Sequence, residues 1–207
     1  LLLMQVTLRY VGGVEADQSA PLDVVRALKG LAFVQLYAIY EYAVVQSVIA
    51  ANRTVSSHKI AHSALRHSLL PLALDSECKS LADCGPSREW DVRRGLMAGS
   101  RASDPAAITD TLFPSDGSHF RRRQLNTIWE LFGLDSSIVP EPRLLGRIDE
   151  LVEKRNSVAH GRESAESVGA RFSLSDLEAR LVDIATVCRH VIESLDSHVS
   201  EPRNLAG

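Results

Sequence analysis

The sequence has few cysteines, few aromatic residues and little excess charge. Its three cysteines, Cys78, Cys84 and Cys188, form no CxxC pair, and aromatic residues make up 5% of the chain. An odd cysteine count argues against a disulfide framework, so we expect a reducing, cytoplasmic compartment. The formal net charge of −3 argues against a protein that coats nucleic acid through bulk electrostatics. A local basic site stays compatible with that charge, because phosphate affinity comes from clustered Lys and Arg.

Two further features are missing. Neither GxGxxG nor GxxxxGK[ST] occurs, so neither phosphate-binding loop of the nucleotide folds is present. No uninterrupted membrane-length apolar run occurs either, because residues 31–51 carry Gln35, Glu41 and Gln46. A charge at the centre of a bilayer helix costs about 2.5–3.5 kcal/mol on insertion scales. We therefore expect a helix buried in a bundle and no membrane span.

Helical periodicity accounts for most of the chain. It predicts one long helix, or two in line, at residues 23–51, and a helix at 56–74 that stops near Pro71. Further helices are predicted at 121–132 and 143–160, and in the last helix Ser175 and Glu178 form a capping box. The apolar positions of the last helix step by 4, 3, 4, 3 and 4, at Leu177, Leu181, Ile184, Cys188, Val191 and Leu195. Gly161 is expected to end its helix in the left-handed conformation.

The remaining segments complete the predicted architecture. Residues 5–11 alternate polar and apolar side chains, which is typical of a short strand. Residues 75–118 are rich in Gly and Pro and predict loops and short helices inserted at the edge of the fold. We predict an all-α bundle of about five helices in one domain, residues 1–207, with a core at about 21–74 and 119–200.

The richest group of chemical side chains lies in residues 151–162, LVEKRNSVAHGR. Asn156 and His160 are four apart and share a helix face, whereas Arg155 lies about 140° from His160 around the axis. Arg155 and His160 can still line one cleft if the cleft wraps around the helix end, or if a second copy of the chain completes it.

These residue types suit cleavage of a phosphodiester without a metal. A histidine in the last helical turn is favoured in its protonated form, and His160 would handle protons at the ribose 2′-OH or the leaving oxygen. Arg155 would stabilise charge on the phosphoryl group, and Asn156 would position the phosphate or orient the imidazole. The alternative is two ordinary cations in a C-terminal turn, which the spacing alone favours. Indeed, Arg53 and His58 repeat the spacing without the Asn.

The wider context resembles a known family. ELVEKRNSVAHG resembles the signature of HEPN domains, an Arg followed by a polar residue and then a His four to six residues after the Arg. Its Asn-Ser-Val-Ala-His-Gly ending is similar to the toxin- and defence-type HEPN ribonucleases. Two segments resemble that branch more loosely, LYAIYEYAVVQSVI at residues 36–49 and HFRRRQLNTIWELFGLD at residues 119–135.

The resemblance implies a helical bundle that dimerises and pairs two motif helices into one RNA-cleaving groove, with no metal or cofactor. It makes Arg155 and His160 the catalytic pair and Asn156 the adjacent polar member, and it allows a neutralising antitoxin as partner. Some members carry a modifiable Tyr where this chain has Arg162, so regulation through that tyrosine is not expected. Two alternatives stay open: a non-catalytic HEPN module that binds nucleotide, RNA or protein, and a structural interaction protein.

Supporting residues are also expected. Glu41 could pair with Arg155 or tune His160; alternatively it could bind another Arg or a tyrosine hydroxyl in the core, or face solvent. Lys154 would add to the local positive charge. The basic residues expected to contact the RNA backbone, unless they form a solvated face, are Arg121, Arg122, Arg123, beside His119 and Phe120, and Arg162.

His58, His62 and His67 are close in sequence, with His58 and His62 four apart. A zinc site is the less favoured interpretation, because no HExxH glutamate or suitably spaced cysteine accompanies them. A solvated basic face is favoured.

Overall fold

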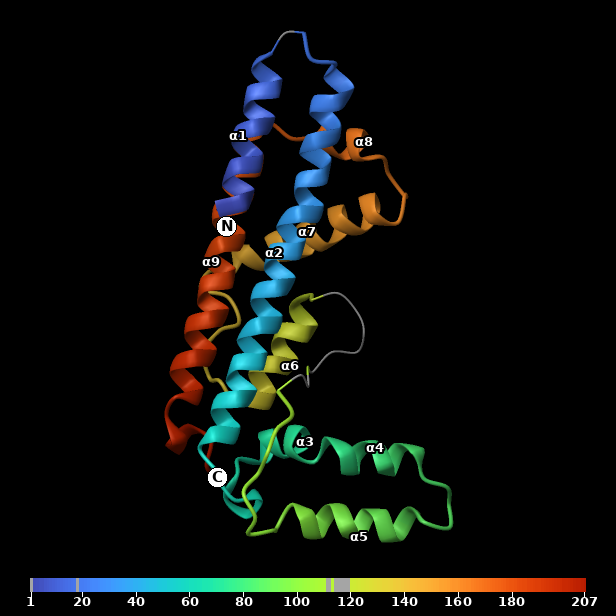
Figure 1. Ribbon diagram of the computed structural model, residues 1–207, viewed down its shortest axis with the longest axis vertical. Coiled ribbons are helices and arrows are strands. Elements are labelled where there is room, and N and C mark those ends of the chain that lie inside the picture. The colour runs from blue at the N-terminus through green and yellow to red at the C-terminus, as the bar shows by residue number, and fades with distance from the viewer. Residues whose placement is uncertain (1, 18, 111–112, 114–119) are drawn as a thin grey trace. The chain divides into compact units, whose positions relative to one another are not determined.

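The computed structural model describes residues 2–17, 19–110, 113 and 120–207. These residues form nine α-helices, joined by turns and short 3₁₀ segments, and contain no β-strand longer than an isolated bridge (Figure 1). The predicted all-α class is therefore confirmed. The number of helices exceeds the predicted five or so because several helices are short.

Contacts divide the chain into two compact units. The first comprises the described residues of 1–44, 117–123 and 137–191, and the second those of 45–116, 124–136 and 192–207. The division falls within three helices: α2 (Leu22–Ser57), α6 (Arg122–Phe132) and α9 (Leu174–Val199). The single domain predicted over residues 1–207 stays a prediction.

The first unit is built around the N-terminal part of α2. Its buried side chains recur every three or four residues, which is the spacing of one helix face: Phe33, Leu36, Tyr37, Tyr40 and Val44. No Pro follows Pro21 in this stretch, and α2 runs without a break, which is the first of the two predicted alternatives. The helix α1 (Leu2–Ala16) runs back along it (Figure 1), and Lys29 pairs with Glu15 at 2.6 Å.

Two glycines bring the short helix α8 (Ala165–Gly169) against α2. A Cβ at Gly30 would overlap the carbonyl oxygen of Ala165, and a Cβ at Gly169 would overlap the carbonyl oxygen of Arg26. Backbone therefore packs directly on backbone, and no larger residue fits at either position without movement of a helix.

An ion-pair network joins α7 (Arg143–Ala159) to α9 in the first unit. The side chain of Asp183 is 9% exposed and accepts hydrogen bonds from Arg143 at 2.7 Å and Arg147 at 2.9 Å. Arg180 donates to both carboxylate oxygens of Glu150, at 2.9 and 3.1 Å. Because both partners of each pair are satisfied, the network fixes how α7 lies against α9.

The second unit contains the middle of the chain. Its short helices are α3 (Leu70–Ala73), α4 (Asp75–Asp83) and α5 (Glu89–Gly99), and α4 and α5 lie side by side as a hairpin (Figure 1). Neither α4 nor α5 has a buried residue. Short helices and loops were predicted here; the insertion itself stays a prediction.

Three local predictions are wrong. Residues 5–11 are helical within α1, because Met4, Leu8 and Val11 form one buried helical face. The predicted helix at 56–74 is replaced by turns and α3, since α2 ends at Ser57 and Lys59 has a φ of 53°. Pro71 begins α3 rather than ending a helix, as its fixed φ favours.

The cap of α9 also differs from the prediction. Ser173 rather than Ser175 caps the helix: its hydroxyl accepts from the amide of Asp176 at 3.1 Å, and its own amide donates to the Asp176 carboxylate at 2.9 Å. This reciprocal pair is a capping box shifted by two residues, with Asp in place of Glu.

None of the described helices is long and apolar enough to cross a membrane.

Candidate catalytic site at the end of α7

The helix α7 carries the motif because its apolar residues hold it in the first unit. Leu144, Ile148, Leu151 and Val152 are buried, which leaves the opposite face and the C-terminal end for polar side chains. The helix ends at Ala159, and Gly161 has a φ of 65°, the left-handed conformation predicted for it.

The chain turns back immediately after the motif. The amide of His160 donates to the carbonyl of Asn156 at 3.0 Å, and the amides of Arg162 and Glu163 both donate to the carbonyl of Ser157, at 2.9 and 3.1 Å. His160 itself is exposed as the last residue of this cap, with φ −98° and ψ 8°. Backbone amides thus hydrogen-bond to carbonyl groups at the helix end that have no partner within the helix. The imidazole of His160 lies outside the helix.

Arg155 is half-buried and held on two sides. Its guanidinium carbon lies 4.7 Å from the centre of the Tyr37 ring, and its Nη1 donates to the side-chain oxygen of Asn156 at 2.9 Å. A guanidinium over an aromatic face is attracted by the ring quadrupole. The planar fork is therefore oriented before any ligand arrives, which is what bidentate binding of a phosphate requires.

The Tyr37 ring is itself anchored. Tyr37 is 1% exposed, and its hydroxyl donates to Oε1 of Glu41 at 3.2 Å, one turn along α2. Burial, followed by the negative charge of Glu41, raises the pKa of Tyr37 to about 12 against the opposing effects of the Phe120 amide and Arg155. Tyr37 is therefore a neutral phenol near neutral pH. Glu41 has the tyrosine hydroxyl as its partner, one of the alternatives the sequence left open.

The segment that leads into α6 lies beside this cluster. The backbone of Phe120 hydrogen-bonds to Tyr37, and Arg121 faces Asp149 of α7 at 3.7 Å. Arg121, Arg122 and Arg123 are exposed at the start of α6, whereas His119 lies outside the described residues. The structure thus brings the start of the arginine run to the Tyr37 end of the site.

The other predicted basic residues lie around the end of α7. Lys154 is partly buried and pairs with the neighbouring Glu153 at 3.3 Å, so part of its charge is balanced within the helix. Arg162 is exposed directly after Gly161.

The histidines of the second unit form separate contacts. A ring nitrogen of His58 lies 2.9 Å from the carbonyl of Val199, and one of His62 lies 3.0 Å from the carbonyl of Asp104. Within the described part of the chain, no three His, Cys, Asp or Glu side chains lie close enough together to hold a metal ion.

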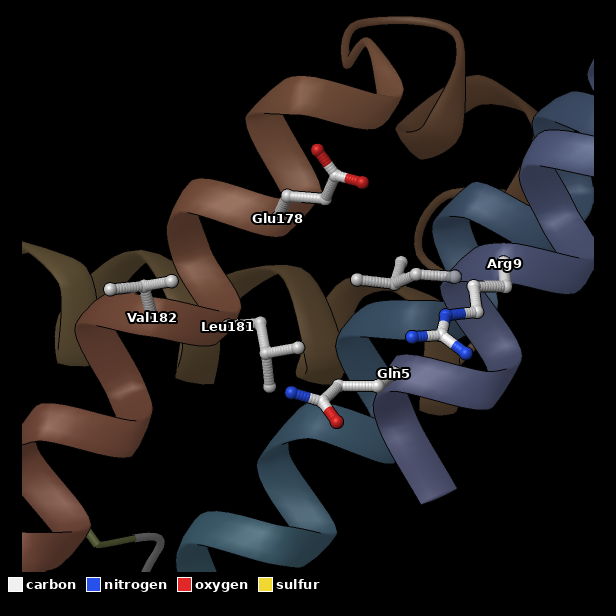
Figure 2. A pocket seen from close by; sticks show the side chains of 6 residues that line it. Gln5, Arg9, Glu178, Leu181 and Val182 are labelled. Carbon is white, nitrogen blue, oxygen red and sulfur yellow. The ribbon is translucent and has the colours of Figure 1, made fainter. Parts of the chain in front are cut away.

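A pocket of about 250 Å³ in the first unit lies apart from these residues. It lies between α1 and α9 (Figure 2), and none of the predicted site residues lines it. The side chains that line it are Gln5, Leu8, Arg9, Glu178, Leu181 and Val182. No histidine is among these lining residues.

Sequence reasoning missed Tyr37 as a site residue. Tyr37 was not singled out, although its position four residues before Glu41 places both on one helix face. That spacing could have predicted the hydrogen bond between Tyr37 and Glu41. The stacking on Arg155 had no counterpart in the sequence.

Comparisons with known proteins identify the family of the chain. The family model described as HEPN_MAE_28990-like HEPN matches residues 14–203 of the 207-residue chain. No curated protein and no solved structure matches the chain. The match spans the described parts of α2 to α9 and includes the Arg155–His160 segment. The chain therefore belongs to the HEPN family.

Proposed function

We propose that this protein is a metal-independent endoribonuclease of the toxin or defence type. It cleaves RNA phosphodiester bonds at a groove that two copies of the chain form together. The observation that supports this most is the oriented guanidinium of Arg155 on the same helix end as the exposed imidazole of His160. Their combination supplies a proton carrier and a fixed cation for a phosphoryl group.

In the proposed reaction the ribose 2′-oxygen attacks phosphorus and the bond to the 5′-oxygen breaks. In the groove of two copies, one His160 accepts the proton of the attacking 2′-OH, and the other, protonated, donates a proton to the departing 5′-oxygen. The products are a 2′,3′-cyclic phosphate and a 5′-hydroxyl end. Arg155 stabilises the negative charge that grows on the non-bridging oxygens. Asn156 keeps Arg155 in place, and Glu41 does so indirectly through Tyr37.

The remaining basic residues bind the RNA backbone in this proposal. Arg121, Arg122, Arg123 and Arg162 contact phosphates, and Lys154 adds to the positive potential at the end of α7. Phosphate contacts of this kind weaken as salt concentration rises, so the apparent affinity for RNA falls between 50 and 200 mM salt, with a slope that reports the number of contacts.

The test is cleavage of a single-stranded RNA in excess EDTA. His160→Ala is expected to lower the rate by about 10²–10⁴-fold, the usual value of a general acid or base. Arg155→Ala is expected to lower it by about 10²–10³-fold, as loss of a charge-stabilising group does. Arg53→Ala and His67→Ala are matched controls, because both side chains are exposed and lie outside the proposed site. Undiminished cleavage by either site variant overturns the assignment.

A second candidate is a HEPN module that binds RNA without cleaving it. The exposed Arg122 and Arg162 favour it, because phosphate binding needs no proton carrier. Filter binding distinguishes the two functions: retention of RNA that is recovered intact supports the module, and recovery of fragments supports the nuclease.

The proposed toxin type also allows a neutralising partner protein. Such a partner would restore the growth of cells in which it is expressed together with the active protein.

A further inference from the structure

Tyr37 lies under the one arginine of the HEPN motif. The two residues come from α2 and α7, 4.7 Å apart between the guanidinium carbon and the ring centre. We propose that Tyr37 is a positioning residue. Its ring keeps the guanidinium of Arg155 in the orientation in which the guanidinium contacts the scissile phosphate. This inference rests on the proposed function and adds to it a residue outside the Arg–His motif.

The ring is suited to this role because it cannot move easily. Tyr37 is 1% exposed, and the edge of the ring packs on Tyr40, with ring centres 6.2 Å apart. A buried ring in a close-packed core keeps one rotamer, so its face offers Arg155 a fixed surface. An aliphatic side chain of similar size would fill the space without attracting the cation.

The hydroxyl group fixes the ring from its other end. It donates to Glu41 at 3.2 Å, and the Phe120 backbone hydrogen-bonds to Tyr37. Glu41 thus acts on Arg155 through the position of the ring. With a pKa of about 12, Tyr37 is a protonated phenol near neutral pH and can act as the donor to Glu41.

Asn156 completes the support of the guanidinium. It holds Nη1 at 2.9 Å while the ring covers one face, so rotation about the last bonds of the arginine side chain is opposed in two directions. A guanidinium prepared in this way loses little conformational entropy when it binds a transition state. Misplacement by about 1 Å at such a group can cost about 10²-fold in rate.

The experiment compares two buried rings of the same helix. Tyr37→Leu removes the ring under Arg155, and Phe33→Leu removes an equally buried ring that packs on Phe172. We expect kcat for an RNA oligonucleotide to fall by about 10–100-fold in Tyr37→Leu with KM within about 3-fold, because positioning acts in the transition state. Phe33→Leu is expected to keep kcat within about 3-fold below its melting temperature.

A double-mutant cycle separates positioning from general damage to the core. In an Arg155→Lys background, Tyr37→Leu should lower kcat by no more than about 3-fold, since the planar group that the ring orients is already gone. An equal loss in both backgrounds overturns the proposal. Tyr37→Trp, which keeps an aromatic face, should recover part of the kcat lost in Tyr37→Leu.

A measurement without RNA keeps the inference separate from the proposed function. The Arg155 side-chain NH resonance should show an upfield ring-current shift in the wild type and in Tyr37→Phe, but not in Tyr37→Leu. If the wild type cleaves RNA and Tyr37→Leu has the same kcat, the positioning role is overturned and the nuclease stands. If the wild type does not cleave RNA, the proposed function fails, whatever the NMR shift shows.

Tyr37→Phe tests the anchoring of the ring by Glu41 in a variant that keeps the aromatic face under Arg155. It removes only the oxygen that Glu41 holds, and we expect kcat to fall by about 3–10-fold. An unchanged kcat in this variant overturns the anchoring by Glu41.

Discussion

Asn156 accepts a hydrogen bond from Nη1 of Arg155 through its side chain and from the amide of His160 through its backbone carbonyl. One residue thus contacts both members of the proposed catalytic pair by different groups. The backbone contact survives any substitution other than proline, whereas the side-chain contact does not. Asn156 therefore allows the orientation of Arg155 to be disturbed with the helix end left intact.

Asn156→Ala is expected to lower kcat for RNA cleavage by about 10-fold, since an uncharged group that only orients a catalytic one contributes about 1–2 kcal/mol. Steady-state kinetics with an oligonucleotide measures this. Asn126→Ala is the matched control, because Asn126 is a half-buried asparagine of α6 outside the proposed site. Equal losses of kcat in both variants would contradict a specific role for Asn156.

Asp183→Ala should destabilise the fold by about 2–3 kcal/mol. The carboxylate is 9% exposed and binds two arginines, and breaking a buried pair costs about 3–5 kcal/mol, less here because Arg147 keeps Glu150 at 3.1 Å. Urea denaturation measures the free energy of unfolding. Glu166→Ala serves as control, because its contact with Arg26 is exposed and 4.0 Å long, and it should change stability by less than about 1 kcal/mol.

Gly30→Ala should destabilise the first unit by at least about 1–3 kcal/mol, because the added methyl group meets the backbone of α8. Gly146→Ala is the opposite case. It lies within α7 with no atom near the added Cβ, and alanine there should raise stability by about 0.5–1 kcal/mol. Thermal melts of the two variants should shift in opposite directions; a shift of both in the same direction would argue against the close approach of α8.

Stability should also depend on pH through His198. Burial, and after it the charge of Arg66, lowers the pKa of His198 below its usual 6.5, against the opposing effects of Phe132 and Asp135. The unfolded chain therefore binds this proton more readily than the folded chain. The contribution of His198 is fully present above pH 6.5 and is lost as the pH falls through the folded pKa.

His198→Gln tests this dependence. The free energy of unfolding, measured in urea from pH 7.5 to 5, should fall less steeply with decreasing pH in the variant than in the wild type. Equal slopes for the two proteins would show that another group is responsible.

The sequence was sufficient to predict α7, its end at Gly161 and the course of α2, because each follows from local periodicity and helix-end chemistry. It failed at residues 5–11, where alternation over seven residues fits a strand but tertiary packing of Leu8 and Val11 selects a helix. Short windows cannot distinguish these, because the deciding contacts come from other helices.

The site, too, could be predicted from local sequence patterns only in part. The motif residues could be found because they lie within six positions of one another. The contact of Arg155 with Asn156 could not, because adjacent residues on a helix point in different directions and only the long arginine chain bends back. The ring of Tyr37 is brought to Arg155 by the packing of α2 near α7, which no local pattern encodes.

The short helix α8 has a mechanical consequence for the motif. It follows Gly161 after only three residues, which can span about 10 Å when extended, and it rests backbone to backbone on Gly30 of α2. A short connection and α8 thus link the end of α7 to α2, the helix that also carries Tyr37. A substitution at Gly30 that displaces α8 would therefore act on the short segment next to His160 without touching His160 or Arg155.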